Sequence, residues 1–262
     1  MPFAEVNGQR LYYEDTDGDG AAVIFSHGLL MDQEMFAPQV TALRGEYRCI
    51  SWDERGHGQT GPATQAFSYW DSADDVHALA AHLGVDRAFL VGMSQGGFVA
   101  LRAALRYPDF VRGIGLIDTQ AGVEDPDLVP QYRLMSETWQ EHGLNDDLAE
   151  IIAGIIMSPG FPGNGDWIAK WKAQPVDHLD VPLETLFSRE DLHDRLAEIR
   201  CPAIVFHGEA DAAIPMEQAE ALATGLPNCD ALVRIPGAGH ASNLSHPDAV
   251  NGPLLQFLQR HA

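Results

Sequence analysis

The sequence has little positive charge and almost no lysine. Its 262 residues include 16 Lys and Arg against 38 Asp and Glu, which gives a formal net charge of −22 at pH 7, and Lys170 and Lys172 are its only lysines. Such a surface repels phosphate backbones and anionic lipid headgroups. The basic residues are scattered and form no stripe, so we expect no nucleic-acid partner and no membrane partner.

Cysteine and long apolar runs are also scarce. Cys49, Cys201 and Cys229 cannot all pair within one chain, and each lies in or beside an apolar segment, where reduced, buried thiols are common. No stretch approaches the ~20 consecutive apolar residues of a membrane span, and the first residues lack the pattern of a secretory signal. The expected location is the reducing cytoplasm.

Patterns that bind metal are missing as well. The sequence has no His-Glu-x-x-His motif and no Cys/His cluster, and His77 and His82 are spaced so that they would not share one face of a helix. We therefore expect no metal and no cofactor.

The apolar residues form short runs that alternate with helical stretches. Six runs are typical of strands buried on both faces: 21–25, 47–52, 88–91, 113–117, 203–206 and 231–235. A hairpin, 3–6 and 10–14, precedes them around the turn formers Asn7 and Gly8. Helices are predicted at 71–83, 94–107, 216–226 and 248–260. This alternation predicts an α/β fold with a mostly parallel, eight-stranded sheet covered on both faces.

One long segment interrupts the alternation. Residues 120–192 contain no convincing strand, only helical patches at 127–142, 146–157, 166–173 and 183–192. We interpret the segment as a helical lid inserted into a core formed by residues 1–119 and 193–262.

The strongest chemical signal is Gly-x-Ser-x-Gly at residues 92–96, directly after a predicted strand and directly before a predicted helix. At such a junction the motif is typical of a nucleophile elbow, in which Ser94 occupies a sharp turn and its neighbours must lack side chains. A purely structural glycine turn is the alternative. A dinucleotide-binding motif would need glycine at Ser94.

A serine nucleophile needs a base and a carboxylate, and this architecture places them later in the chain in the order acid, then histidine. Asp211 follows the predicted strand 203–206, and His240 follows the strand 231–235. Asp118, after the strand 113–117, is the alternative acid. His27 and His57 are interpreted as hydrogen-bonded structural residues, and Glu209 as a surface group or a neighbour of the site.

These motifs together resemble the α/β-hydrolase fold superfamily, and most of all its esterase, cofactor-free haloperoxidase and enol-lactonase branch. The resemblance rests on five segments: 25–29, 52–58, 92–97, 207–211 and 237–240. It implies that Ser94 is the nucleophile, His240 the general base and then acid, and Asp211 the orienting carboxylate. It further implies that the backbone N–H groups of Leu29 and Gln95 form the oxyanion hole.

Two departures within the superfamily are informative. Relatives commonly carry an acid where Ser245 stands, in Asn-Leu-Ser-His-Pro at residues 243–247. Haloalkane dehalogenases and epoxide hydrolases carry an aspartate nucleophile at the elbow, so Ser94 argues against both activities.

The predicted lid is rich in tryptophan. Trp139, Trp167 and Trp171 either line a substrate pocket or pack the lid onto the core, and Trp167 and Trp171 would share one face of a helix. The expected function is hydrolysis of a small-molecule carboxylic ester or lactone through an acyl-enzyme. The alternatives are hydrolysis of a carbon–carbon bond in a ring-cleavage diketone and slow-turnover ligand sensing. The sequence does not indicate an oligomeric state.

Overall fold

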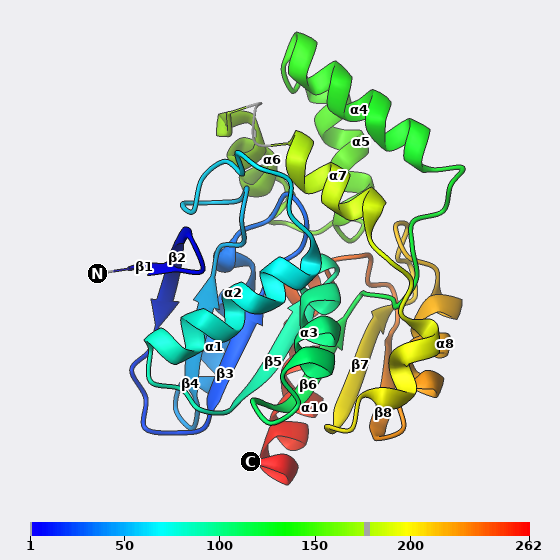
Figure 1. The fold of residues 1–262 in the computed structure, drawn as a ribbon. Coiled ribbons are helices and arrows are strands. Elements are labelled where there is room, and N and C mark those ends of the chain that lie inside the picture. Colours follow the sequence, from blue (N-terminus) through cyan, green and yellow to red (C-terminus); the bar gives the residue numbers. More distant parts are fainter. Residues whose placement is uncertain (1, 176–178) are drawn as a thin grey trace.

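The computed structural model describes residues 2–175 and 179–262, which fold around one eight-stranded sheet (Figure 1). In their order across the sheet, the strands are β1 (Phe3–Val6), β2 (Gln9–Asp15), β4 (Arg48–Trp52), β3 (Ala22–Ser26), β5 (Ala88–Met93), β6 (Val111–Ile117), β7 (Ala203–Gly208) and β8 (Cys229–Ile235). The β1–β2 and β2–β4 pairs are antiparallel, and all pairs from β4 to β8 are parallel. The predicted α/β fold with a mostly parallel sheet is confirmed.

Helices cover both faces of the sheet, which explains the continuous apolar character of its central strands. On one face lie α2 (Tyr69–His82), α3 (Gln95–Arg106) and α8 (Met216–Gly225), and on the other α1 (Ala37–Leu43) and α10 (Pro247–His261) (Figure 1). Every residue of β3 and β5 is buried. No helix of the described residues is long and apolar enough to cross a membrane.

Four short helical elements of the described residues were not predicted from the sequence. They are η1 (Gln33–Phe36), α1, η3 (His193–Glu198) and α9 (Ser242–Ser245). Each is too short for the apolar repeat of a helix to be recognised. In addition, α1 carries a proline in its first turn, a position that helices tolerate but that resembles a break in the sequence.

The segment between β6 and β7 is helical, and its helices lie beyond the carboxyl ends of the strands (Figure 1). They are α4 (Val129–His142), α5 (Asp146–Ile156), α6 (Asn164–Ala173) and α7 (Asp180–Ser188), followed by η3 (His193–Glu198). We call residues 129–188 the helical insertion. Its last helix begins earlier than predicted and ends before residue 189, where the chain becomes extended.

Trp171 attaches the helical insertion to the core. Its side chain is fully buried, and its indole N–H donates a 2.8 Å hydrogen bond to the carbonyl oxygen of Leu30, in the loop after β3. A buried indole N–H without an acceptor would carry a large desolvation cost, so this bond fixes where the insertion meets that loop.

We expect Trp171→Ala to lower the free energy of unfolding by about 3–5 kcal/mol, because a large buried side chain is lost. Trp171→Phe should cost less, since a phenyl ring still fills most of the site, although the hydrogen bond and part of the buried indole are lost. Urea unfolding followed by circular dichroism measures both. Trp70→Phe is the control, because Trp70 is only partly buried and its indole binds Glu190 in an exposed pair. If Trp70→Phe lowers the free energy of unfolding as much as Trp171→Ala does, Trp171 has no special role in attaching the insertion to the core.

Candidate active site

Ser94 lies at the turn between β5 and α3 in a backbone conformation that non-glycine residues rarely adopt. Its φ is 51° and its ψ is −117°. The two flanking glycines are required by close backbone contacts: a Cβ on Gly92 would collide with the carbonyl group of Gly96, and a Cβ on Gly96 with that of Ser26. The turn therefore brings the start of α3 directly against the end of β3, with Ser94 at its apex.

Two hydrogen bonds hold this turn in place. The N–H of Ser94 donates to Ile117 O at 2.9 Å, and the hydroxyl of Thr119 donates to Ser94 O at 2.7 Å. Both partners lie at or just after the end of β6, the neighbouring strand. The strained residue is thus tied to the carboxyl edge of the sheet.

Gln95 is the first residue of α3, so its backbone N–H has no acceptor inside the helix. Its side chain is buried and fixed: Nε2 donates to Glu54 Oε2 at 2.6 Å, and Oε1 accepts from the Tyr69 hydroxyl at 3.3 Å. Burial raises the pKa of Glu54 to about 8, so this acid is mostly neutral at pH 7.

His240 and Asp211 meet at the ends of β8 and β7. His240 Nδ1 lies 2.8 Å from Asp211 Oδ2, while Asp211 Oδ1 accepts the N–H groups of Ala213 at 2.8 Å and Ile214 at 3.0 Å. An ionised carboxylate has no proton to donate, so Nδ1 carries the hydrogen. In neutral His240 this leaves Nε2 as the acceptor.

The pKa values of this pair favour ionised Asp211. Burial opposes ionisation of Asp211, but His240 and the N–H donors outweigh it, and the pKa of Asp211 lies below its ordinary value. For His240, burial lowers the pKa, yet the charge and hydrogen bond of Asp211 raise it above the ordinary value of 6.5. Asp118 and Glu124 add smaller contributions in the same direction.

Among the described residues, no hydrogen bond joins Asp118, the alternative acid, to the His240 ring. Its two oxygens accept the backbone N–H groups of Gly208 and Ser242, each at 2.9 Å. Burial and the nearby charge of Asp211 raise the pKa of Asp118. It therefore joins the loops that carry Asp211 and His240.

Asp118, His207 and Asp211 also place potential metal-ligand atoms within 4.8 Å of one another. Hydrogen bonds already use the oxygens of both carboxylates, and His207 Nε2 contacts Ile214 O at 2.9 Å. These contacts favour a structural network at this position.

Leu29 belongs to the loop that follows β3, and this loop faces Ser94. A Cβ on Gly28, the preceding residue, would come within 2.6 Å of Met93 Sδ, so the loop passes close to the elbow. His27 is buried at its base, with Nδ1 2.8 Å from Gly28 O and Nε2 accepting the N–H of Glu54 at 3.0 Å. These contacts are those of a structural histidine.

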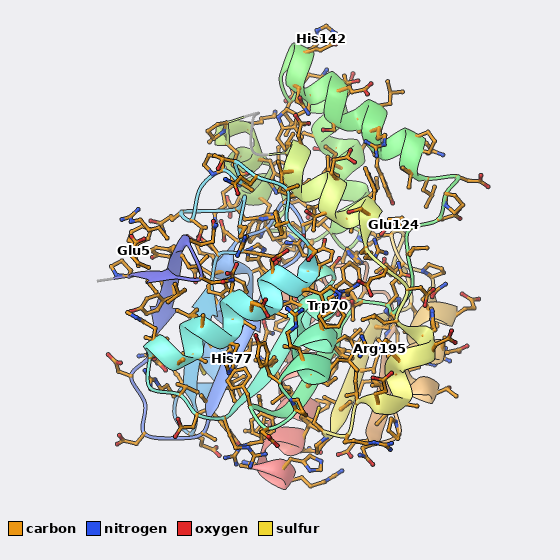
Figure 2. The ribbon with its side chains drawn as sticks, viewed as in Figure 1. Glu5, Trp70, His77, Glu124, His142 and Arg195 are labelled. Atoms are coloured by element: carbon orange, nitrogen blue, oxygen red, sulfur yellow. The ribbon has the colours of Figure 1, made fainter. Side chains whose placement is uncertain are left out.

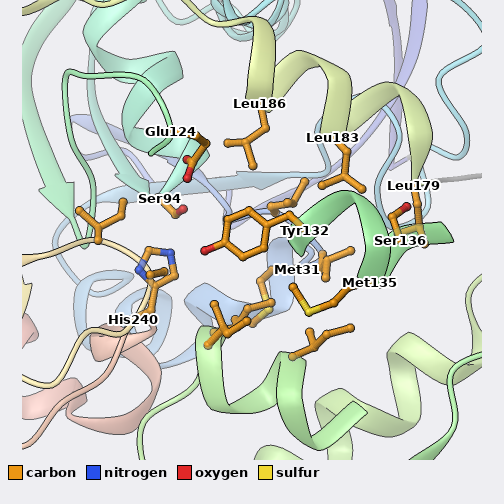
Figure 3. Close-up of a pocket in the computed structure, with 18 of the residues that line it drawn as sticks. Met31, Ser94, Glu124, Tyr132, Met135, Ser136, Leu179, Leu183, Leu186 and His240 are labelled. Carbon is orange, nitrogen blue, oxygen red and sulfur yellow. The ribbon is translucent and has the colours of Figure 1, made fainter. Parts of the chain in front are cut away.

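A cavity of about 120 Å³ opens between this edge of the sheet and the helical insertion (Figure 3). Ser94 and His240 both line it, and no hydrogen bond joins their side chains among the described residues. Catalytic hydrogen bonds are often long until substrate binds. Most of the wall is apolar and comes from Leu29, Leu30, Met31, Met93, Met135, Trp139, Ile152, Ile155, Ile156, Leu179, Leu183, Leu186 and Ile214.

Of the three tryptophans considered for substrate binding, Trp139 lines the cavity. Trp167 and Trp171 are not among its described lining residues. The indole of Trp171 is directed to Leu30 O, and the ring of Trp167 lies 4.4 Å from Lys170 Nζ. Packing of the insertion accounts for both.

Four polar residues near the site carry no motif and were missed in the sequence. Glu124, Tyr132 and Ser136 line the cavity, and Ser158 of the insertion accepts the N–H of Gly239, beside His240, at 2.7 Å. Ser158 Oγ also hydrogen-bonds Ser245 Oγ. Ser245, at the position where the sequence departs from the expected pattern, is thus hydrogen-bonded to the insertion.

The fold is that of one family. The family model of the alpha/beta hydrolase fold matches residues 21–247, and the chain belongs to that family. The resemblance to its esterase, haloperoxidase and enol-lactonase branch is confirmed by its structural neighbours.

Individual relatives cover nearly the whole chain. A RutD protein of Caulobacter sp. (strain K31), provisionally named a carbamate hydrolase, is 30% identical over 96% of this chain and 97% of its own. A thermophilic esterase from Thermogutta terrifontis, solved with malate bound, has a TM-score of 0.89 and 28% identity, covering 100% of this chain and 98% of its own. The enol-lactonase from Burkholderia xenovorans LB400 has a TM-score of 0.89 and 25% identity, covering 98% and 100%.

Because the backbone is closely packed around the turn at Ser94, a single methyl group added at Gly96 should destabilise the fold strongly. We expect Gly96→Ala to lower the free energy of unfolding by about 1–3 kcal/mol or more, because the new Cβ overlaps the backbone of β3. Urea unfolding measures the loss. The matched control is Gly154→Ala in α5, an exposed helical position where nothing lies within 4 Å of the new Cβ and a gain of about 0.5–1 kcal/mol is expected. Equal stabilities of the two variants would contradict this interpretation.

Proposed function

We propose that the protein is a serine hydrolase that cleaves a carboxylic ester or lactone through an acyl-enzyme. One observation carries the proposal. Ser94, on a strained turn at the carboxyl edge of the sheet, lines the same cavity as His240, whose far nitrogen is bound to Asp211. The accepting nitrogen of His240 is therefore available on the cavity side to take a proton from a serine hydroxyl.

In the proposed reaction Ser94 Oγ attacks the carbonyl carbon and His240 Nε2 takes the hydroxyl proton. The tetrahedral intermediate collapses, the bond to the leaving oxygen breaks, and His240 returns the proton to the departing alcohol. A water molecule then repeats the sequence on the acyl-enzyme, releasing the acid and regenerating Ser94. Asp211 orients His240 and stabilises its cationic form throughout.

The backbone N–H groups of Leu29 and Gln95 are proposed to bind the developing oxyanion. Gln95 supplies the first free N–H of α3, next to Ser94, and Leu29 lines the cavity beside it. Each such donor contributes on the order of 10²–10³ in rate. The buried hydrogen bond between the Gln95 side chain and Glu54 would keep the N–H of Gln95 in place.

We further propose that residues 120–192 act as a lid over a core of residues 1–119 and 193–262. The insertion supplies much of the apolar cavity wall, including Trp139, and would exclude water from the acyl-enzyme. An engineered apolar cavity of about 150 Å³ holds benzene in another protein, so a short acyl group suits this cavity.

Carbamates are a second candidate substrate. The observation in their favour is the 30% identity to a protein provisionally named a carbamate hydrolase. A carbamate presents the same kind of carbonyl carbon to Ser94, so the proposed residues keep their roles. Assays with an ester and a carbamate of equal size distinguish the two.

Ser94→Ala should reduce kcat/KM for short-chain esters by about 10³-fold or more, because the nucleophile is lost. In the wild type, a phosphonate ester should add one phosphonyl group to Ser94, detected by mass spectrometry of its peptide. The control is Ser188→Ala, an exposed serine at the end of α7. Full turnover by Ser94→Ala, or an unlabelled wild type, would disprove the mechanism. Burst kinetics without further turnover would favour ligand sensing.

The raised pKa of His240 predicts how activity depends on pH. The base must be neutral to accept a proton, so kcat/KM should fall as the pH drops through the pKa of His240. Because Asp211 raises this pKa, the midpoint should lie above the ordinary 6.5. A pH profile with a short-chain ester measures it, and circular dichroism across the same range separates loss of activity from unfolding. A midpoint at or below 6.5 would contradict the assigned base.

A further inference from the structure

Glu124 places a carboxylate in a cavity whose wall is mostly apolar. It follows β6 and precedes α4, at the junction between the sheet and the insertion (Figure 2). Of the described residues that line the cavity, Glu124 alone bears a carboxylate and none is Lys or Arg. Figure 3 shows the carboxylate directed to the end of the cavity where Ser94 lies.

A buried arginine holds Glu124 from behind. Arg189 Nη2 is 2.9 Å from Glu124 Oε1, and the other guanidinium nitrogens donate to Gly122 O at 3.0 Å and Leu186 O at 2.7 Å. The Arg189 side chain is 1% exposed, against 10% for Glu124, and Arg189 does not line the cavity. The ion pair therefore presents its negative end to the substrate.

The second carboxylate oxygen, Glu124 Oε2, has no hydrogen-bond partner among the described residues. Tyr132 lines the same part of the cavity, and Figure 3 shows its hydroxyl pointing toward His240. Burial and the charge of Glu124 raise the pKa of Tyr132 to about 12, so its hydroxyl keeps its proton at neutral pH. The wall near Ser94 thus offers a fixed acceptor and a neutral hydroxyl.

We propose that Glu124 makes the cavity select short acyl groups that carry a hydrogen-bond donor, such as an amide or hydroxyl, and reject those that carry a carboxylate. The inference rests on the proposed hydrolase function and names the substrate class of that site. When substrate displaces water, Glu124 Oε2 loses its solvation, and a donor on the acyl group restores a hydrogen bond. A substrate carboxylate would instead meet a like charge in a low-dielectric cavity.

Three methyl esters of nearly the same shape test the proposal: methyl succinamate, methyl isocaproate and monomethyl succinate. They end in an amide, an apolar branch and a carboxylate, respectively. At a pH where the activity profile is flat, the wild type should hydrolyse methyl succinamate with a kcat/KM about 100-fold above that for monomethyl succinate. The kcat/KM for methyl isocaproate should lie between these two values. Product acid and methanol are followed by chromatography.

Glu124→Gln should reduce the succinamate-to-succinate ratio of kcat/KM to less than about tenfold, because the like-charge contact is gone. The matched control is Glu137→Gln on α4, an exposed glutamate, which should keep the wild-type ratio. If Glu124→Gln does not fold, the ranking of the three esters by the wild type tests the proposal instead. The wild-type kcat/KM for methyl succinamate should then be about 100-fold above that for monomethyl succinate.

The outcomes separate the two proposals. Hydrolysis of all three esters at similar kcat/KM, or an unchanged ratio in folded Glu124→Gln, overturns the role of Glu124 and leaves the serine mechanism intact. If the wild type hydrolyses none of the esters and a phosphonate does not label Ser94, the hydrolase function fails, and the inference built on it fails as well.

Discussion

The strained turn at Ser94 is the constraint on which the rest of the site depends. A positive φ at a non-glycine residue costs about 1–3 kcal/mol and persists only where its surroundings enforce it. Here the surroundings are Gly92 and Gly96, which let α3 approach β3, and the bonds to Ile117 and Thr119 at the end of β6. The same contacts fix the start of α3 beside Ser94, so the proposed nucleophile and the proposed oxyanion donor Gln95 are positioned together.

The surroundings of three buried acids near the site, Asp211, Glu54 and Asp118, shift their pKa values differently, and of these three only Asp211 hydrogen-bonds the His240 ring among the described residues. Asp211 receives two backbone N–H groups and the imidazole, which keep its pKa low. Glu54 lies in a fully buried position and its pKa rises to about 8. Burial and the nearby charge of Asp211 raise the pKa of Asp118. An ionised carboxylate that is hydrogen-bonded to His240 suits its proposed role as a base, which would become cationic during the reaction.

Much of the core could be predicted from the sequence because its strands are buried on both faces and its motifs occupy strand ends. The strand runs and the positions of Ser94, Asp211 and His240 at one sheet edge follow from that pattern. The choice between Asp211 and Asp118 depends on loop geometry that spacing does not encode. Glu124 and Tyr132 belong to the insertion and its connection, where helices repeat no family motif, so only the structure brings them to the cavity.

Hydrogen bonds join the insertion to two loops of the site. Trp171 bonds the carbonyl of Leu30, next to the proposed oxyanion donor Leu29, and Ser158 bonds the N–H of Gly239, next to His240. Glu124, at the connection to the insertion, faces Ser94. Opening the insertion as a rigid body would therefore break hydrogen bonds to two of the loops that hold the proposed catalytic groups. Local motion of cavity-wall side chains such as Met135 and Leu183, which form no such bonds among the described residues, would leave these contacts intact.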